Sequence, residues 1–286
     1  MHPRNIHNVA YNFDLLISNH PDLATFIIKN KSGDHTIDFS DPKAVLALNT
    51  ALLKSHYGVK KWDIPDGFLC PAVPGRADYI HHLADMLYTE FPNTKNFKGL
   101  DIGTGANCIY PILGTQIYNW TMVGCDINKQ SFEAAQQNMT YNSHFKPPIE
   151  IRFQSNPAYI FKGIVSPDEY FDFCMCNPPF HNSEKEATKG TLRKLRNLGN
   201  ENNNVSLNFG GQSNELWCNG GEALFLKRMI KQSVNFSTQI GLFTSLVAKK
   251  EHLPKLQKQL SKLKATHYCI EMSHGNKKSR VLAWRF

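Results

Sequence analysis

The chain has 286 residues, of which 41% are hydrophobic and 11% aromatic, enough to build a full core and to exclude global disorder. Lysine and arginine outnumber aspartate and glutamate by 32 to 24, and this net charge of +8 suits a polyanionic partner, although a merely basic protein would show the same excess. The start lacks an apolar leader and no run of 18 apolar residues occurs, so we expect a cytoplasmic protein without a membrane partner.

The first part of the chain, residues 1–75, is predicted to be an extension that is helical at first and then irregular. Its last segment, residues 67–75, holds too many prolines and glycines for a regular element. Apolar residues then recur at helical spacing from Arg76 to Tyr88, so an amphipathic helix is expected to open the second region, residues 76–286.

From residue 97 onward, apolar strands alternate with helices. This alternation predicts an α/β, Rossmann-like domain with a seven-stranded, mostly parallel sheet. The last two strands are joined only by residues 273–280, too few for a helical crossover, so the last strand is expected to be antiparallel. The predicted strands are 98–102, 121–125, 149–153, 171–176, 240–244, 268–272 and 281–286, and the helices are 109–118, 129–141, 222–234 and 253–263.

A glycine-rich turn follows the first of these strands, in the sequence Asp101-Ile-Gly103-Thr-Gly105-Ala-Asn107. Glycines let backbone N–H groups and a helix N-terminus approach a ligand closely. The next strand ends in Asp126, where a carboxylate can hold ribose hydroxyls or, alternatively, cap the following helix. A dinucleotide loop would have a third glycine. The pattern instead resembles the S-adenosylmethionine cradle of Rossmann-like methyltransferases, in which Asp101 would organise the loop near the methionine ammonium.

A second motif, Asn177-Pro178-Pro179-Phe180, ends an apolar strand. The prolines stop the strand, and the Asn177 amide oxygen and the Pro178 carbonyl can both accept hydrogen bonds from an NH₂ group, while Phe180 offers a stacking face. The motif resembles that of methyltransferases that act on adenine, cytosine or glutamine amino groups. Cys174 and Cys176 precede it on one face of the strand, where a core position is more usual than a metal pair, and we expect no metal.

A long polar segment, residues 182–220, interrupts the alternation and is predicted to be a loop insertion that contacts RNA phosphates, with a solvated loop as the alternative. Its basic residues are Lys185, Lys189, Arg193, Lys194 and Arg196.

Strings along nearly the whole chain resemble the bacterial large-subunit (23S) ribosomal RNA adenine-N6 methyltransferases of the RlmF family, and more distantly the eukaryotic U6 small nuclear RNA adenine-N6 methyltransferase. They include His2-Pro-Arg-Asn5 and the segments 62–71, 74–82, 105–111, 207–211 and 215–218.

The resemblance implies methyl transfer from S-adenosylmethionine to an adenine N6 in ribosomal RNA. We expect a monomer that acts on free RNA or an assembling large subunit, with residues 1–75 helping to recognise the RNA. It implies that Arg76, Gly103, Asn107, Asp126 and Asn177 contact the cofactor or reaction centre, with Arg76 on the methionine carboxylate. A surface ion pair with Asp78 or Asp85 is the alternative for Arg76. The loop after the third strand, Gln154-Ser-Asn156-Pro-Ala158, should touch the cofactor adenine.

Two other functions share parts of these motifs. A protein glutamine-N5 methyltransferase would use the same cofactor loop and a similar Asn-Pro-Pro turn, but the basic charge and Phe180 favour RNA. An RNA-binding protein with an inactive methyltransferase core would not be expected to keep Asp101, Asp126 and Asn177 together.

Overall fold

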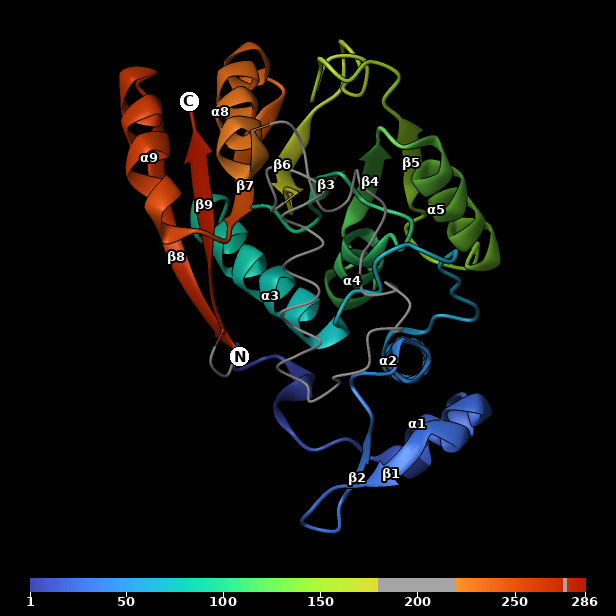
Figure 1. Cartoon of the computed structure of the whole chain (residues 1–286). Helices are drawn as coiled ribbons and strands as arrows, with labels where there is room; N and C mark the ends of the chain where they lie inside the picture. The colour runs from blue at the N-terminus through green and yellow to red at the C-terminus, as the bar shows by residue number, and fades with distance from the viewer. Residues whose placement is uncertain (180–219, 275–276) are drawn as a thin grey trace.

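A seven-stranded sheet with the order β5-β4-β3-β6-β7-β9-β8 forms the centre of the computed structural model, which describes residues 1–179, 220–274 and 277–286 (Figure 1). Strands β5, β4, β3, β6 and β7 are parallel, whereas β9 is antiparallel to both β7 and β8. The predicted sheet and its antiparallel last strand are therefore confirmed. The strands are β3 (Lys98–Ile102), β4 (Thr121–Asp126), β5 (Glu150–Phe153), β6 (Phe171–Cys176), β7 (Ile240–Val247), β8 (Thr266–His274) and β9 (Lys277–Arg285).

Alternating side chains of the central strands fill two apolar cores, one on each face of the sheet. In β6, Phe173 and Met175 pack on the face covered by α2, α3 and α4, whereas Cys174 and Cys176 pack on the face covered by α8 and α9. Both cysteines are buried, and no described group of three or more histidines, cysteines or acids could hold a metal. The helices of this region are α3 (Val73–Glu90), α4 (Ile109–Tyr118), α5 (Lys129–Tyr141), α8 (Gly221–Ser233) and α9 (Leu253–Lys262), with short 3₁₀ turns η3 (Val234–Phe236) and η4 (Lys250–His252).

The N-terminal region shares the first of these cores. Leu16, Leu23 and Leu52 are buried in the same cluster as the α3 and α4 side chains, so this region is not an independent body. Its elements are η1 (Ile6–Asn8), α1 (Phe13–Asn19), η2 (Pro21–Phe26), β1 (Ile27–Lys29), β2 (His35–Ile37) and α2 (Pro42–Tyr57). The small β1-β2 hairpin was not predicted from the sequence.

Helix α3 begins at Val73, three residues before the predicted start at Arg76. Pro74 lies in its first turn, where a missing N–H breaks no helical hydrogen bond, so a proline that suggested a loop in fact starts the helix. In the part of the chain that the structure describes, no helix is long and apolar enough to cross a membrane.

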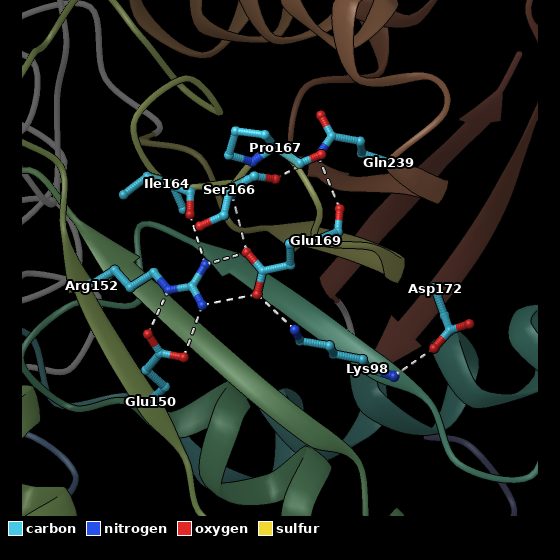
Figure 2. Close-up of polar contacts among 9 residues, drawn as sticks. All are labelled: Lys98, Glu150, Arg152, Ile164, Ser166, Pro167, Glu169, Asp172 and Gln239. Carbon is cyan, nitrogen blue, oxygen red and sulfur yellow. Dashed lines mark hydrogen bonds and ion pairs between the residues drawn. The ribbon is translucent and has the colours of Figure 1, made fainter.

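A polar network joins the sheet to the loop between β5 and β6 (Figure 2). Glu169 lies at its centre and accepts hydrogen bonds from Arg152 Nη1 (2.6 Å) and Nη2 (2.9 Å), and from Lys98 Nζ (2.6 Å). Arg152 also pairs with Glu150, which neighbours it on β5. These cations lower the pKa of Glu169 to about 2, overcoming the opposing effect of its burial.

Candidate cofactor and reaction site

A cavity of about 580 Å³ lies where β3, β4 and β6 end. Parallel α/β sheets bind ligands at this position, beyond the carboxyl ends of their strands. Residues from both predicted motifs share the cavity, since Gly103, Gly105 and Asn107 line it together with Asp126, Asn177 and Pro179. The cavity therefore brings the glycine turn and the Asn-Pro-Pro turn to one place.

The glycine turn folds back on the end of β4. Gly103 and Gly105 have φ angles of +75° and +66°, a left-handed conformation that favours glycine. The Gly103 and Thr104 N–H groups donate to the Cys125 carbonyl, both at 2.9 Å, and Gly105 N–H donates to Asp126 Oδ2 at 2.9 Å. A Cβ added to Gly103 would meet no atom within 4 Å, so open space for a ligand begins at its backbone.

Asp126 is buried at the end of β4 but still lines the cavity. Its Oδ1 accepts from Asn128 N–H at 2.8 Å, and burial raises its pKa although backbone N–H groups oppose this shift. Asn128 itself caps α5, with its side chain accepting from Ser131 N–H. Asp126 therefore holds the loop before the helix rather than capping the helix, and each of its oxygens has a lone pair left for a ligand.

Asp101 lies beneath the glycine turn, fully buried in β3 and not on the cavity lining. Burial raises its pKa to about 7, and the nearby Asp126 charge adds to the shift. Neither of its oxygens forms a hydrogen bond of ordinary geometry with a described residue, and only the nearby Thr104 hydroxyl and the Arg76 charge oppose the pKa shift. A buried carboxyl without a partner is costly unless a donor or cation supplies one.

Unpartnered polar atoms are concentrated around this cavity. Eight buried side-chain atoms in the described residues lack a hydrogen-bond partner, and five of them belong to Asp101, Thr104, Ser131 and Asn177. The last three residues line the cavity. Since buried polar groups normally have partners, this clustering fits a polar ligand that supplies them.

Arg76 reaches the cavity from the first turn of α3. Its Nη1 donates to the Tyr110 hydroxyl at 3.0 Å, and its guanidinium lies 5.6 Å from the centre of that ring. Asp78 and Asp85, its alternative partners, instead bind N-terminal residues: Asp78 accepts from the His2 and Asn5 nitrogens, and Asp85 contacts His2 and Arg4. Arg76 thus lines the cavity and is held there by the uncharged Tyr110 hydroxyl.

Asn177 follows β6 directly, and its Oδ1 is buried without a described partner. The strand below is fixed by hydroxyls: the Thr244 hydroxyl donates to the Cys174 carbonyl at 3.0 Å and accepts from the Tyr79 hydroxyl at 2.9 Å. Pro178 is buried and Pro179 lines the cavity. Phe180 lies outside the described residues, as do the predicted RNA contacts Lys185, Lys189, Arg193, Lys194 and Arg196.

The connection between α2 and α3 is hydrogen-bonded to the glycine turn and to α5. Trp62 Nε1 donates to the Asn107 carbonyl at 2.8 Å. Asn138 Nδ2 donates to both the Asp63 carbonyl (2.8 Å) and the Ala106 carbonyl (3.1 Å). The N-terminal region is thereby tied to the glycine turn itself.

The whole chain, residues 1–286, matches a family described as RNA methyltransferase. The chain belongs to this RNA methyltransferase family. The predicted enzyme class is therefore confirmed, and so is S-adenosylmethionine as the methyl donor.

Curated relatives and solved structures agree with this family. "Ribosomal RNA large subunit methyltransferase F" of Christiangramia forsetii is 56% identical over the full length of both chains. The protein of the same name from Flavobacterium johnsoniae is 51% identical and covers all of this chain and 93% of its own. The hMettl16 catalytic domain in complex with MAT2A 3'UTR hairpin 6 has a TM-score of 0.82 at 30% identity, covering 100% of this chain and 97% of that one. The N-terminal domain of human METTL16 in complex with SAH has a TM-score of 0.77 at 28% identity, covering 100% of this chain and 98% of that one.

In this methyltransferase, part of the loop after β5 lines the cavity. Gln154 and Pro157 line it, whereas Asn156 and Ala158 do not. The Asn156 side chain instead holds the turn by accepting from Ala158 N–H at 2.9 Å. Tyr159 and Ile160, just beyond, also line the cavity.

The cavity residues that come from α4 and α8 were not predicted from the sequence. Leu224, Phe225 and Arg228 reach it from α8, and Tyr110 reaches it from α4. Arg228 is fixed by donating to the Pro157 carbonyl at 2.8 Å. No local pattern predicts these residues, although an aromatic and an arginine three residues apart, on the helix before β7, are a usable signal.

Proposed function

We propose that this methyltransferase transfers the S-adenosylmethionine methyl group to the exocyclic N6 of one adenine in 23S ribosomal RNA. The observation behind this proposal is the Asn177 Oδ1 atom, which is buried at the cavity without a described partner and could accept a hydrogen bond from the amino group that receives the methyl group. The names of relatives that are about 50% identical over their full length support ribosomal RNA of the large subunit.

The cavity residues suit each part of the cofactor. Asp126 would accept from the ribose hydroxyls, and the Arg76 guanidinium would bind the methionine carboxylate. Asp101, buried and without a partner, would compensate the positive charge of the methionine ammonium through the glycine turn. The cofactor adenine would lie against the cavity residues Gln154, Pro157 and Tyr159. The hydrogen bond between Asn156 and Ala158 would hold the turn that carries these residues.

The Asn-Pro-Pro turn would position the target amine. An adenine N6 lone pair is delocalised into the ring, so the amine is a poor nucleophile until acceptors draw its nitrogen toward a tetrahedral shape. Asn177 Oδ1 and the Pro178 carbonyl are the two acceptors, and Phe180 would stack on the base. The bound cofactor supplies an electrophilic methyl group, so positioning, not a strong base, is what the chain provides.

Recognition of the RNA would involve the insertion at 182–220 and the N-terminal extension 1–75. The basic residues of the insertion, Lys185 to Arg196, would bind phosphates. The extension would contact the glycine turn through the hydrogen bond of Trp62. We infer a monomer that acts in the cytoplasm on free RNA or an assembling subunit.

A U6 small nuclear RNA type of substrate is the second candidate, because the fold matches the hMettl16 catalytic domain along the whole chain. Higher identity to the bacterial relatives favours ribosomal RNA. The Asn177 acceptor would also suit a glutamine amide, but the RNA methyltransferase family and the names of the relatives favour RNA.

The test is mass spectrometry of 23S ribosomal RNA from a strain that lacks this protein. One N6-methyladenine should be absent, should return with the wild-type gene, and should not return with Asn177→Ala. A complete set of modified adenines in the deletion strain would refute the substrate, and loss of methylation from another RNA would reassign it.

A further inference from the structure

Exposed basic side chains gather on α8, α9 and the turns beside them. Nine basic side chains are exposed there, whereas Glu251 is the only exposed acid in residues 220–265. We call these nine residues the α8–α9 basic ridge. They are Lys227, Arg228, Lys231, Lys249, Lys250, Lys255, Lys258, Lys262 and Lys264.

The ridge follows from how α9 packs. Its leucines, Leu253, Leu256 and Leu260, are buried against the sheet. Lys255, Lys258 and Lys262 fall on the opposite side and form a row about 10 Å long at 1.5 Å per residue. The two helices lie side by side (Figure 1), linked where Gln259 Nε2 donates to the Lys227 carbonyl at 2.9 Å.

An ordinary solvated helix mixes both signs of charge, and this one does not. None of the nine basic residues forms an ion pair with another residue that the structure describes. Lys255 and Lys258 are three apart and Lys258 and Lys262 four apart, a spacing at which like charges weaken a helix. A bound polyanion would relieve this repulsion.

A groove of about 360 Å³ lies within the ridge, between the two helices. Lys227 of α8 and Lys255 of α9 both line it, together with His252 and Glu251. His252 is held through its Nδ1, 2.6 Å from the Oε2 of the buried Glu222, so its Nε2 is free of that contact. Two lysines and an imidazole face one carboxylate, that of Glu251, in this groove, so the donors outnumber the acid and suit a phosphate group.

Helix α8 connects this groove to the reaction site. Arg228 lines the cofactor cavity, while its neighbour Lys227 lines the groove. We propose that the α8–α9 basic ridge binds the phosphate backbone of the substrate RNA, as a second footprint that starts at the cavity and runs across α8 onto α9. The length of the lysine row suits a polyanion rather than a single small anion. This inference rests on an RNA substrate, and so on the proposed function.

The test is binding of deproteinised 23S ribosomal RNA to the full-length protein over a series of salt concentrations. Lys255→Ala/Lys258→Ala should lower the slope of log affinity against log salt by about 1.5 to 2, near one unit per lost phosphate contact. Alanine favours helix, so α9 should stay folded. A matched pair, Lys95→Ala/Lys146→Ala, removes two exposed lysines outside the ridge and should leave the slope unchanged.

Cofactor affinity by calorimetry and the methylation rate at saturating RNA should stay at wild-type values in the ridge variant, because neither lysine lines the cofactor cavity. An unchanged salt slope overturns the proposal, as does an equal drop in the matched pair. An unchanged RNA slope with loss of binding to phosphatidylserine vesicles would assign the ridge to a membrane surface. A wild-type protein that binds this RNA without methylating it would count against the proposed function, whereas the slope comparison would still decide the ridge.

Discussion

Asn177→Ala separates chemistry from folding at the reaction turn. The lost Oδ1 is buried and has no described hydrogen-bond partner, so its removal leaves no protein donor unpaired. The hydroxyls of Tyr79 and Thr244 that fix β6 stay in place. We therefore expect the free energy of unfolding to change by less than about 1 kcal/mol, as for substitutions that break no buried contact.

The expected effect on catalysis is much larger. An acceptor that acts on the amine mainly in the transition state should cost about 10²- to 10³-fold in kcat, or about 2.7–4 kcal/mol, by analogy with the donors of an oxyanion hole. Asn177→Asp is the matched control. It keeps an acceptor oxygen at the same place and should retain more activity than the alanine variant.

Single-turnover methylation at saturating cofactor is the assay, with cofactor affinity measured separately by calorimetry because Asn177 also lines the cofactor cavity. If Asn177→Ala transfers methyl groups at the wild-type rate under these conditions, the turn is not the reaction centre and the proposed role of the motif is refuted.

Three further predictions concern the cofactor and the fold. Asp126→Ala should weaken S-adenosylmethionine binding by about 10- to 100-fold in calorimetry, since charged hydrogen bonds to the ribose are lost; equal affinities would contradict the assignment. Tyr110→Phe frees Arg76 from its hydroxyl partner and should weaken cofactor binding about 2- to 10-fold, less than Arg76→Ala does; the reverse order would show that Arg76 does not bind the cofactor. The folded-state pKa of Glu169 lies below its ordinary value of 4.5, at about 2, so the stability it contributes is complete above pH 4.5 and is lost as the pH falls toward 2. Urea midpoints should therefore fall over this window in the wild type and fall less in Glu169→Gln, and parallel curves would refute the role of the network.

The sequence was sufficient to predict the sheet because its strands are short apolar runs with clear interruptions. Both reaction motifs also lie on strand ends, where chain order and spatial position are linked, so their meeting at one cavity followed from topology. The start of α3 was misplaced because Pro74 both breaks and begins helices, depending on which side of the cap it lies. The β1-β2 hairpin was not predicted because three-residue strands are too short to show an alternation of apolar and polar residues.

The contribution of α8 to the cavity could not be predicted in the same way. Arg228 and Phe225 are far along the chain from the glycine turn, and only the packing of α8 on the sheet brings them to it. The loop after β5 shows the converse. Of the loop expected at the cofactor, Gln154 and Pro157 line the cavity, whereas the short Asn156 side chain bonds its own backbone turn.

The hydrogen bonds between the α2–α3 connection and the glycine turn could couple ligand binding at these two segments. Trp62 and Asn138 bind carbonyls of Asn107 and Ala106, residues of the turn that would hold the cofactor. If a ligand that binds this connection raised the cofactor affinity, reciprocity would require the cofactor to raise the affinity for that ligand by the same factor. Substrate RNA and methyl donor would then reinforce each other's binding.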